Sequence, residues 1–147
     1  MKIAVGYDPN AEEYAKEISK FVESLGHEVI NYGGDDPIYA YVAFKVSEDV
    51  AKGKCDRGLL FCGTGIGMSV AANKVKGAYA ACVSNIFQAE RASLSNAANI
   101  ITLGSQVIGL ELAKCFVKEY LSLTFDPQSR SGPKVEAIVE YEREQYK

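Results

Sequence analysis

The stretch Gly58-Leu-Leu-Phe-Cys-Gly-Thr-Gly-Ile-Gly-Met-Ser69 places an apolar run directly before three alternating glycines and a helix-like segment. Short apolar runs of this kind are typical of strands that are buried on both faces of a sheet. A helix that follows such a strand at once is typical of α/β proteins. The stretch therefore predicts a buried strand, a loop of bare backbone and a helix in direct succession.

The same alternation extends along the chain in both directions. Short runs rich in β-branched residues predict five strands, at residues 2–6, 28–32, 58–61, 79–83 and 100–103. Helix-like segments separate them, at residues 11–25, 39–53, 67–74, 86–95 and 107–123. Regular alternation predicts a Rossmann-like three-layer α/β/α sandwich with a five-stranded parallel sheet, joined by right-handed crossovers.

The C-terminal part of the chain, from about residue 126 to 147, departs from this alternation. A polar stretch leads to Pro133, and a charged helix is predicted from Lys134 to about Tyr146. Its apolar residues form a single stripe, made of Val135, Ile138, Val139 and Tyr141. We expect this helix to pack on a partner subunit. Residues 1–147 fit one domain of ordinary size.

The composition excludes several classes of protein. Hydrophobic residues make up 48% and charged residues 24% of the chain, as in ordinary globular proteins. The net charge of −3 leaves no excess of positive charge for a nucleic acid. The first residues are too short a run for a signal peptide, and no apolar run approaches membrane-spanning length. We expect a cytoplasmic protein with neither nucleic-acid nor membrane partners.

Cysteine and glycine motifs argue against a metal site and a nucleotide cofactor. The four cysteines form no C-x-x-C pair, and the lone His27 has no partner for a zinc site. A dinucleotide fingerprint would need glycine or alanine at Met68 and would follow the first strand. A P-loop would end in Gly-Lys-Ser/Thr, which is absent here. No metal and no cofactor are expected.

The glycine loop is the strongest candidate for a binding site. Ligands of parallel sheets lie at the carboxyl ends of the strands, and a helix N-terminus favours an anion. Cys62, at the strand exit, is either a base or nucleophile, or a buried core thiol. Asp8, after the first strand, either contacts substrate hydroxyl groups or caps the following helix.

Four motifs of the chain resemble those of a known family. They are Cys62-Gly-Thr-Gly-Ile-Gly-Met-Ser, Ala71-Ala-Asn-Lys-Val, Asn96-Ala-Ala-Asn and Leu103-Gly-Ser-Gln-Val-Ile-Gly. Over nearly all of its length the chain resembles type B ribose-5-phosphate isomerases and the related galactose-6-phosphate isomerase subunits. The resemblance implies aldose-ketose isomerisation of a sugar phosphate through an enediolate. It also implies a homodimer or dimer of dimers with shared active sites.

The resemblance also implies roles for individual residues. Cys62 matches the catalytic base, and Thr64 would hydrogen-bond the reacting oxygens. The loop amides would form the anion hole, at Gly63, Gly65, Ile66 and Gly67. The substrate contacts would be Asp8, Tyr39, Ser95 and Asn96, and the phosphate ligands Arg130 and Lys134.

The chain departs from the family at its histidines. Pro9, Ser84 and Ser95 stand where the family has histidine, and Gln106 replaces an arginine. Opening a furanose ring needs a group that titrates near neutrality, which serine does not. We favour a substrate that is already open-chain, such as a tetrose phosphate.

Three alternatives remain. The first is ribose 5-phosphate, with Arg91 substituting for the missing cation. The second is one subunit of a mixed-chain isomerase, in which the partner chain supplies the missing groups. The third is a non-catalytic sugar-phosphate sensor, since fold does not fix function. The retained Cys62 speaks against a sensor, because binding alone has no use for a thiol at the position of the base.

Overall fold

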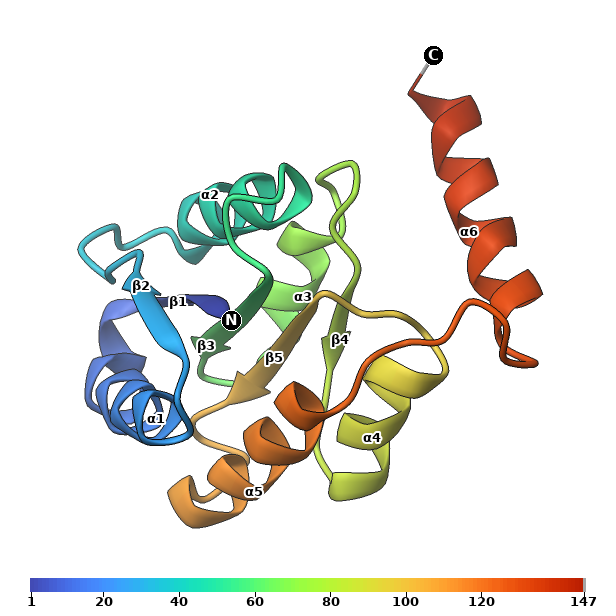
Figure 1. Ribbon diagram of the computed structural model, residues 1–147. Coiled ribbons are helices and arrows are strands. Elements are labelled where there is room, and N and C mark those ends of the chain that lie inside the picture. Colours follow the sequence, from blue (N-terminus) through green and yellow to red (C-terminus); the bar gives the residue numbers. More distant parts are fainter. Residues whose placement is uncertain (147) are drawn as a thin grey trace.

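A computed structural model describes residues 1–146 and contains one parallel five-stranded sheet (Figure 1). The strands are β1 (Lys2–Tyr7), β2 (Glu28–Asn31), β3 (Arg57–Cys62), β4 (Ala80–Cys82) and β5 (Ile100–Gly104). Their order across the sheet is β2-β1-β3-β5-β4. The most apolar strands, β3 and β5, therefore lie inside the sheet, and β4 and β2 lie at its edges.

Six α-helices and one short 3-10 helix complete the part of the chain that the structure describes. They are η1 (Pro9–Ala11), α1 (Glu12–Ser24), α2 (Tyr39–Ala51), α3 (Ile66–Ala72), α4 (Ile86–Leu94), α5 (Leu110–Ser122) and α6 (Gly132–Gln145). Buried side chains of α1, α4 and α5 pack on one face of the sheet, and those of α2 and α3 on the other. The predicted three-layer α/β/α sandwich is confirmed.

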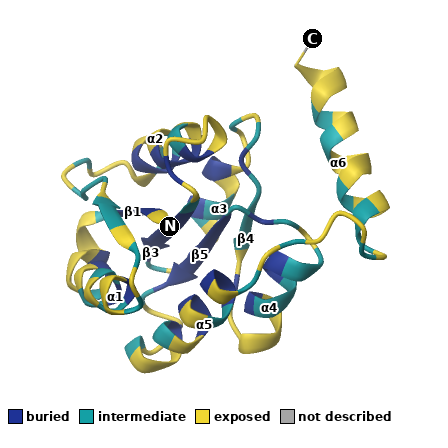
Figure 2. Cartoon of the chain, in the orientation of Figure 1, coloured by how far each residue is buried: buried dark blue, intermediate teal, exposed yellow. Residues whose placement is uncertain are grey.

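Helix α6 stands apart from these layers (Figure 2). It has no buried residue, whereas each of the other α-helices buries at least three. Near its end, Glu142 accepts hydrogen bonds from the Gly77 amide at 2.8 Å and from the Tyr79 hydroxyl. Burial and the nearby carboxylate raise the pKa of Tyr79 to about 12, so this phenol remains a donor at neutral pH.

One predicted helix boundary was wrong. Residues 107–109 were expected to begin the fifth helix, but the amides of Val107 and Ile108 bond the Gly104 carbonyl in a turn. Helix α5 begins at Leu110, with Gly109 in an extended conformation before it. The chain needs this turn because it must reverse direction when it leaves β5. Within residues 1–146, no helix combines the length and the apolar character needed to cross a bilayer.

Asn73 and Asn99, which belong to two of the sequence motifs, hold the edge of the sheet. The Asn73 amide group bonds both the N–H and the carbonyl of Ala80 in β4, at 2.8 and 2.9 Å. The Asn99 amide group accepts from the Tyr79 N–H and donates to the Gly77 carbonyl, both at 2.8 Å. Both side chains thus satisfy backbone groups that the short strand leaves unpaired.

Replacing Asn99 with alanine is expected to lower the free energy of unfolding by about 1–3 kcal/mol. The reason is that two backbone groups would lose their hydrogen-bond partner in a half-buried turn. Urea unfolding followed by circular dichroism measures the change. Asn10→Ala is the control, because Asn10 is exposed and its side chain makes no hydrogen bond to residues 1–146. Equal stability of the two variants would contradict this role.

Candidate active site

Cys62 is the last residue of β3 and lies at the carboxyl edge of the sheet. Its side chain is buried, and its sulfur accepts the N–H of Gly65 at 3.1 Å. Gly65 has a positive φ of 81° and precedes α3 directly, so the loop turns back onto the thiol. The loop thereby fixes the sulfur atom beside the N-terminus of α3.

The amides of the glycine loop fall into two groups. The N–H of Gly65 bonds Cys62, and the N–H of Ile66 bonds the Thr64 hydroxyl oxygen at 3.3 Å. The N–H groups of Gly63 and Gly67 have no acceptor within residues 1–146. Two of the four predicted anion-hole donors are therefore unoccupied, while the other two shape the loop. The proton of the Thr64 hydroxyl is likewise available to a ligand.

Asp8 lies next to the end of β3, where its backbone N–H bonds the Phe61 carbonyl at 3.1 Å. One carboxylate oxygen accepts the N–H groups of Asn10 and Ala11, at 2.9 and 3.1 Å. The capping interpretation of Asp8 is thus confirmed. The other oxygen has no donor among the described residues, which leaves it available for the predicted substrate contact.

Tyr39, the first residue of α2, lies across the start of α3. A Cβ atom built on Gly67 would lie 2.5 Å from the Tyr39 hydroxyl oxygen, far closer than real contacts allow. Only glycine at this position lets the phenol lie beside the loop. Tyr39 is 39% exposed, and its hydroxyl group lies beside Gly67 in the loop that follows Cys62.

Gly67→Ala is expected to raise the KM for the substrate several-fold. The added methyl group would displace the half-exposed Tyr39 ring from the loop. Stability should change little, because alanine favours a helix by about 0.5–1 kcal/mol over glycine. Steady-state kinetics with thermal unfolding measures both effects. Gly109→Ala, where a Cβ meets nothing within 4 Å, is the control. An unchanged KM would contradict a substrate role for Tyr39.

Two residues were not predicted to lie beside the glycine loop, although Gln106 was named above as replacing an arginine of the family. Gln106 accompanies the loop, since a Cβ on Gly63 would lie 3.3 Å from its amide oxygen. Cys82, at the end of β4, has its sulfur 3.2 Å from a Cβ built on Gly65. Neither contact has a signal in the sequence, because both depend on which strands become neighbours.

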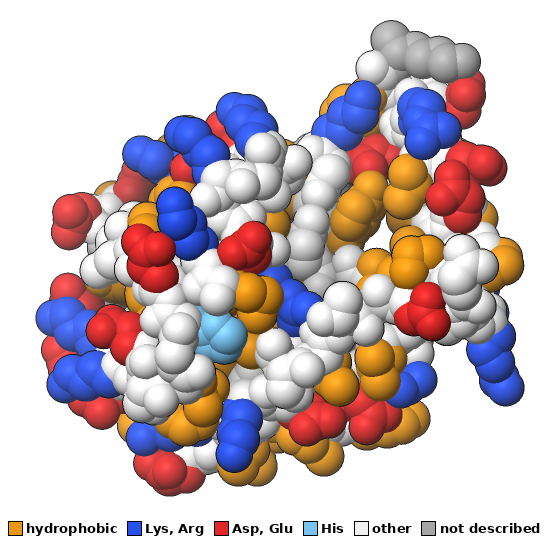
Figure 3. Space-filling view, in the orientation of Figure 1, with side chains coloured by type: hydrophobic (Ala, Val, Ile, Leu, Met, Phe, Trp, Pro, Cys, Tyr) orange, Lys and Arg blue, Asp and Glu red, His pale blue; other side chains and the backbone are white. Residues whose placement is uncertain are grey.

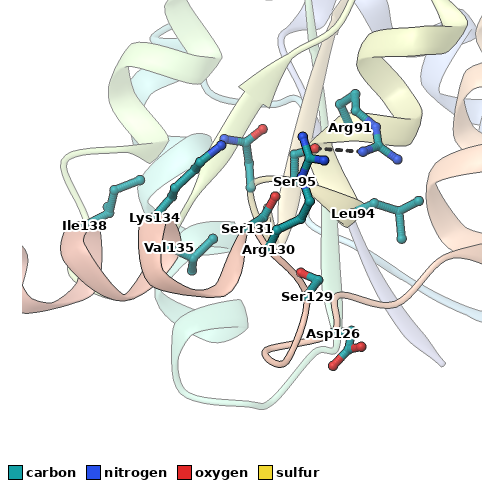
Figure 4. A pocket seen from close by; sticks show the side chains of 11 residues that line it. Arg91, Leu94, Ser95, Asp126, Ser129, Arg130, Ser131, Lys134, Val135 and Ile138 are labelled. Atoms are coloured by element: carbon teal, nitrogen blue, oxygen red, sulfur yellow. Dashed lines mark hydrogen bonds between the residues drawn. The ribbon is translucent and has the colours of Figure 1, made fainter.

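The predicted residues Ser95, Asn96, Arg130 and Lys134 come together elsewhere, around a cavity of about 630 Å³ (Figure 4). Ser95 and Asn96 follow the last residue of α4. The chain turns away from the helix axis at Ala97, which has a positive φ of 51°. Arg130 and Lys134 come from the start of α6 and the segment before it. Neither cation pairs with a carboxylate within residues 1–146. The cavity is therefore suited to an anion.

A second cavity of about 470 Å³ continues between α6 and the body of the molecule. Its lining is mostly apolar and includes Ala80, Phe125, Val135, Ile138 and Val139. Figure 3 shows hydrophobic side chains along the side of α6 that faces the body. Helix α6 thus presents three residues of the predicted apolar stripe toward a space that this chain leaves unfilled, whereas the fourth, Tyr141, is 69% exposed and lies outside this lining.

The two groups of candidate residues lie at opposite ends of the sheet. Cys62 is paired with Gly104, the last residue of β5, whereas the Asn99 carbonyl accepts the N–H of Gly58 at the start of β3. The five residues of β5 span about 13 Å between these ends. Neither cavity beside α6 includes Cys62 or Thr64 in its lining. A ligand bound in the first cavity of one chain does not reach the thiol of that chain.

Nearly the whole chain is similar to known sugar-phosphate isomerases. A family model described as Ribose/Galactose Isomerase matches residues 3–138. D-erythrulose-4-phosphate isomerase 2 of Mycolicibacterium smegmatis is 43% identical over 148 residues, which cover 97% of each chain. D-erythrulose-4-phosphate isomerase of Pectobacterium atrosepticum is 40% identical over 149 residues, which cover 99% of this chain and 97% of the relative.

A solved structure of similar shape carries a different substrate in its name. Ribose-5-phosphate isomerase B of Clostridium thermocellum superposes with a TM-score of 0.92 at 38% sequence identity, covering 99% of each chain. The similarity spans α6 as well as the sheet.

Proposed function

The chain belongs to the ribose/galactose isomerase family and is a sugar-phosphate isomerase, and we propose that its substrate is an open-chain tetrose 4-phosphate. The reaction would interconvert the aldose and the ketose, as erythrose 4-phosphate and erythrulose 4-phosphate. Two similar proteins that act on erythrulose 4-phosphate by name support this choice.

The histidine content of the chain is the observation that carries the proposal. The only histidine, His27, bonds the N-terminal amine at the amino end of β1, with its Nδ1 3.1 Å from that nitrogen. It lines neither cavity beside α6 and lies away from Cys62. The site therefore has no imidazole that could donate a proton to the oxygen of a sugar ring.

A tetrose 4-phosphate has no need of that proton. Closing a furanose would require the oxygen on C4 of the sugar, and in this substrate that oxygen carries the phosphate. A pentose 5-phosphate keeps the C4 hydroxyl free and closes into a ring, which must be opened before isomerisation. The shorter sugar therefore matches a site with Ser95 where related enzymes place histidine.

Proton transfer would be carried out at the carboxyl edge of the sheet. The Cys62 thiolate takes the proton from the carbon beside the carbonyl, and an enediolate forms. The free N–H groups of Gly63 and Gly67 stabilise its developing negative charge, and Thr64 moves a proton between the two oxygens. Return of the proton to the neighbouring carbon completes the isomerisation without any cofactor.

The separation of the two candidate groups supports a homodimer with shared active sites. The thiol and its loop lie at one end of the sheet, and the phosphate-binding cations lie at the other. In a two-fold dimer whose axis runs across the strands, each end of one sheet would meet the opposite end of its partner's sheet. The unfilled space beside α6 would be occupied by the partner subunit, which completes the substrate site.

The cysteines support a reducing compartment, which we propose is the cytosol. All four are free thiols, and two of them, Cys82 and Cys115, are exposed. Exposed free thiols persist where disulfides are kept reduced.

Isotope exchange tests the proposed function. The protein would be incubated in D2O with tetrose, pentose and hexose phosphates, and deuterium entry beside the carbonyl followed by NMR. We expect exchange with the tetrose 4-phosphate. If calorimetry detects binding of a sugar phosphate while none exchanges, the protein is a sensor and the proposal is wrong.

A further inference from the structure

Arg91 is the third cation of the cavity that contains Arg130 and Lys134. Two neighbouring side chains fix the orientation of its guanidinium group. Its Nη1 donates to the Ser95 hydroxyl oxygen at 3.0 Å. Its Nε and Nη2 lie 3.1 and 3.0 Å from one oxygen of Glu90. Since a guanidinium has five N–H donors, two of them remain available to a ligand.

The three cations surround the cavity from opposite sides (Figure 4). Arg130 and Lys134 extend from the α6 side toward Ser95, and Arg91 approaches Ser95 from α4. The lining contains one carboxylate, Asp126, whose Oδ1 already accepts the Gln128 amide at 2.8 Å. Even when Glu90, which pairs with Arg91, is counted with Asp126, three cations stand against two carboxylates, and this remaining positive charge suits a phosphate.

The position of Arg91 depends on the small side chain at residue 95. Arg91 and Ser95 are four residues apart, so both lie on one face at the end of α4. A histidine at residue 95 would remove the hydroxyl group that now accepts from the Arg91 guanidinium. A guanidinium stays protonated near neutrality, so it binds an anion but does not transfer a proton.

We infer that Arg91, oriented by Glu90 and Ser95, binds the substrate phosphate and selects a short open-chain sugar. The inference rests on the proposed function and names the residue that sets its specificity. The Arg91–Ser95 pair replaces a ring-opening group with a phosphate-binding one. In this proposal, Arg91 adds a third cation to Arg130 and Lys134 and holds the phosphate of a sugar that is one carbon shorter than a pentose.

Kinetics of Arg91→Met tests the binding role. We expect the KM for erythrulose 4-phosphate and the inhibition constant of inorganic phosphate to rise about tenfold or more, with kcat largely retained. Arg91→Lys should recover part of this loss. The control is Lys114→Met, which removes a cation paired with Glu111 on α5. An unchanged phosphate inhibition constant, or a fall in kcat alone, would overturn the assignment.

The specificity role is tested by the double variant Arg91→Leu with Ser95→His. We expect the ratio of kcat/KM for ribose 5-phosphate to that for erythrulose 4-phosphate to rise at least tenfold. An unchanged ratio would overturn the specificity role. A wild-type protein inactive on every sugar phosphate would instead refute the proposed function. An active wild type with unaffected Arg91 variants would refute only this inference.

Discussion

Cys62→Ala is expected to lower kcat about a thousandfold for the sugar-phosphate substrate, the largest effect of any single substitution. The side chain would lose the sulfur that takes the proton, while the loop amides and the binding cations would remain. Because alanine fits the space of the buried thiol, the fold should be retained. Deuterium exchange beside the carbonyl should be lost together with turnover.

Cys115→Ala is the matched control for this experiment. Cys115 is an exposed cysteine on α5, on the face of the sheet opposite α3, and its replacement should leave kcat unchanged. Circular dichroism and thermal unfolding establish that both variants are folded. Retention of exchange in Cys62→Ala would show that another group is the base.

Mixing two inactive variants is expected to restore activity, because each active site would combine both ends of the sheet. One variant is Cys62→Ala and the other carries Arg130→Ala with Lys134→Ala. In a heterodimer, one site has both defects and the other has none. Random exchange makes half of the dimers mixed, so about one quarter of all sites should be active.

This experiment needs subunit exchange, which mild denaturation and refolding of the mixture provides. Each variant treated alone is the control and should stay inactive. Recovery near one quarter of the wild-type activity supports a shared site. Absence of recovery, when mass spectrometry shows that mixed dimers have formed, would contradict an active site that is shared between Cys62 of one chain and the cations of the other.

Strand positions were predicted within two residues because each strand is a short β-branched run between polar loops. The glycine loop could also be predicted from the sequence. Its alternating glycines and the helix that follows indicate a loop with exposed amide groups beside Cys62. The start of α5 was predicted too early because Val107 and Ile108 continue the apolar pattern of the helix. In the structure their amides donate to the Gly104 carbonyl in a turn. Hydrogen bonds of this kind are not encoded in apolar periodicity.

The arrangement of the site was much less predictable. Ser95 and Asn96 were grouped with Cys62 by resemblance, yet β5 separates them within one chain. That separation follows from the strand order, which is a property of the whole fold. The contact between Arg91 and Ser95 could have been predicted, because side chains four residues apart on a helix lie next to each other.

The lack of a histidine that could open a sugar ring is explained by a substrate that is already open-chain. The most direct measurement is kcat/KM for erythrulose 4-phosphate and for ribose 5-phosphate with the same wild-type preparation. We expect the tetrose 4-phosphate to be preferred by at least tenfold. A preference for ribose 5-phosphate would overturn the proposed substrate, because it would show that the ring is opened without histidine.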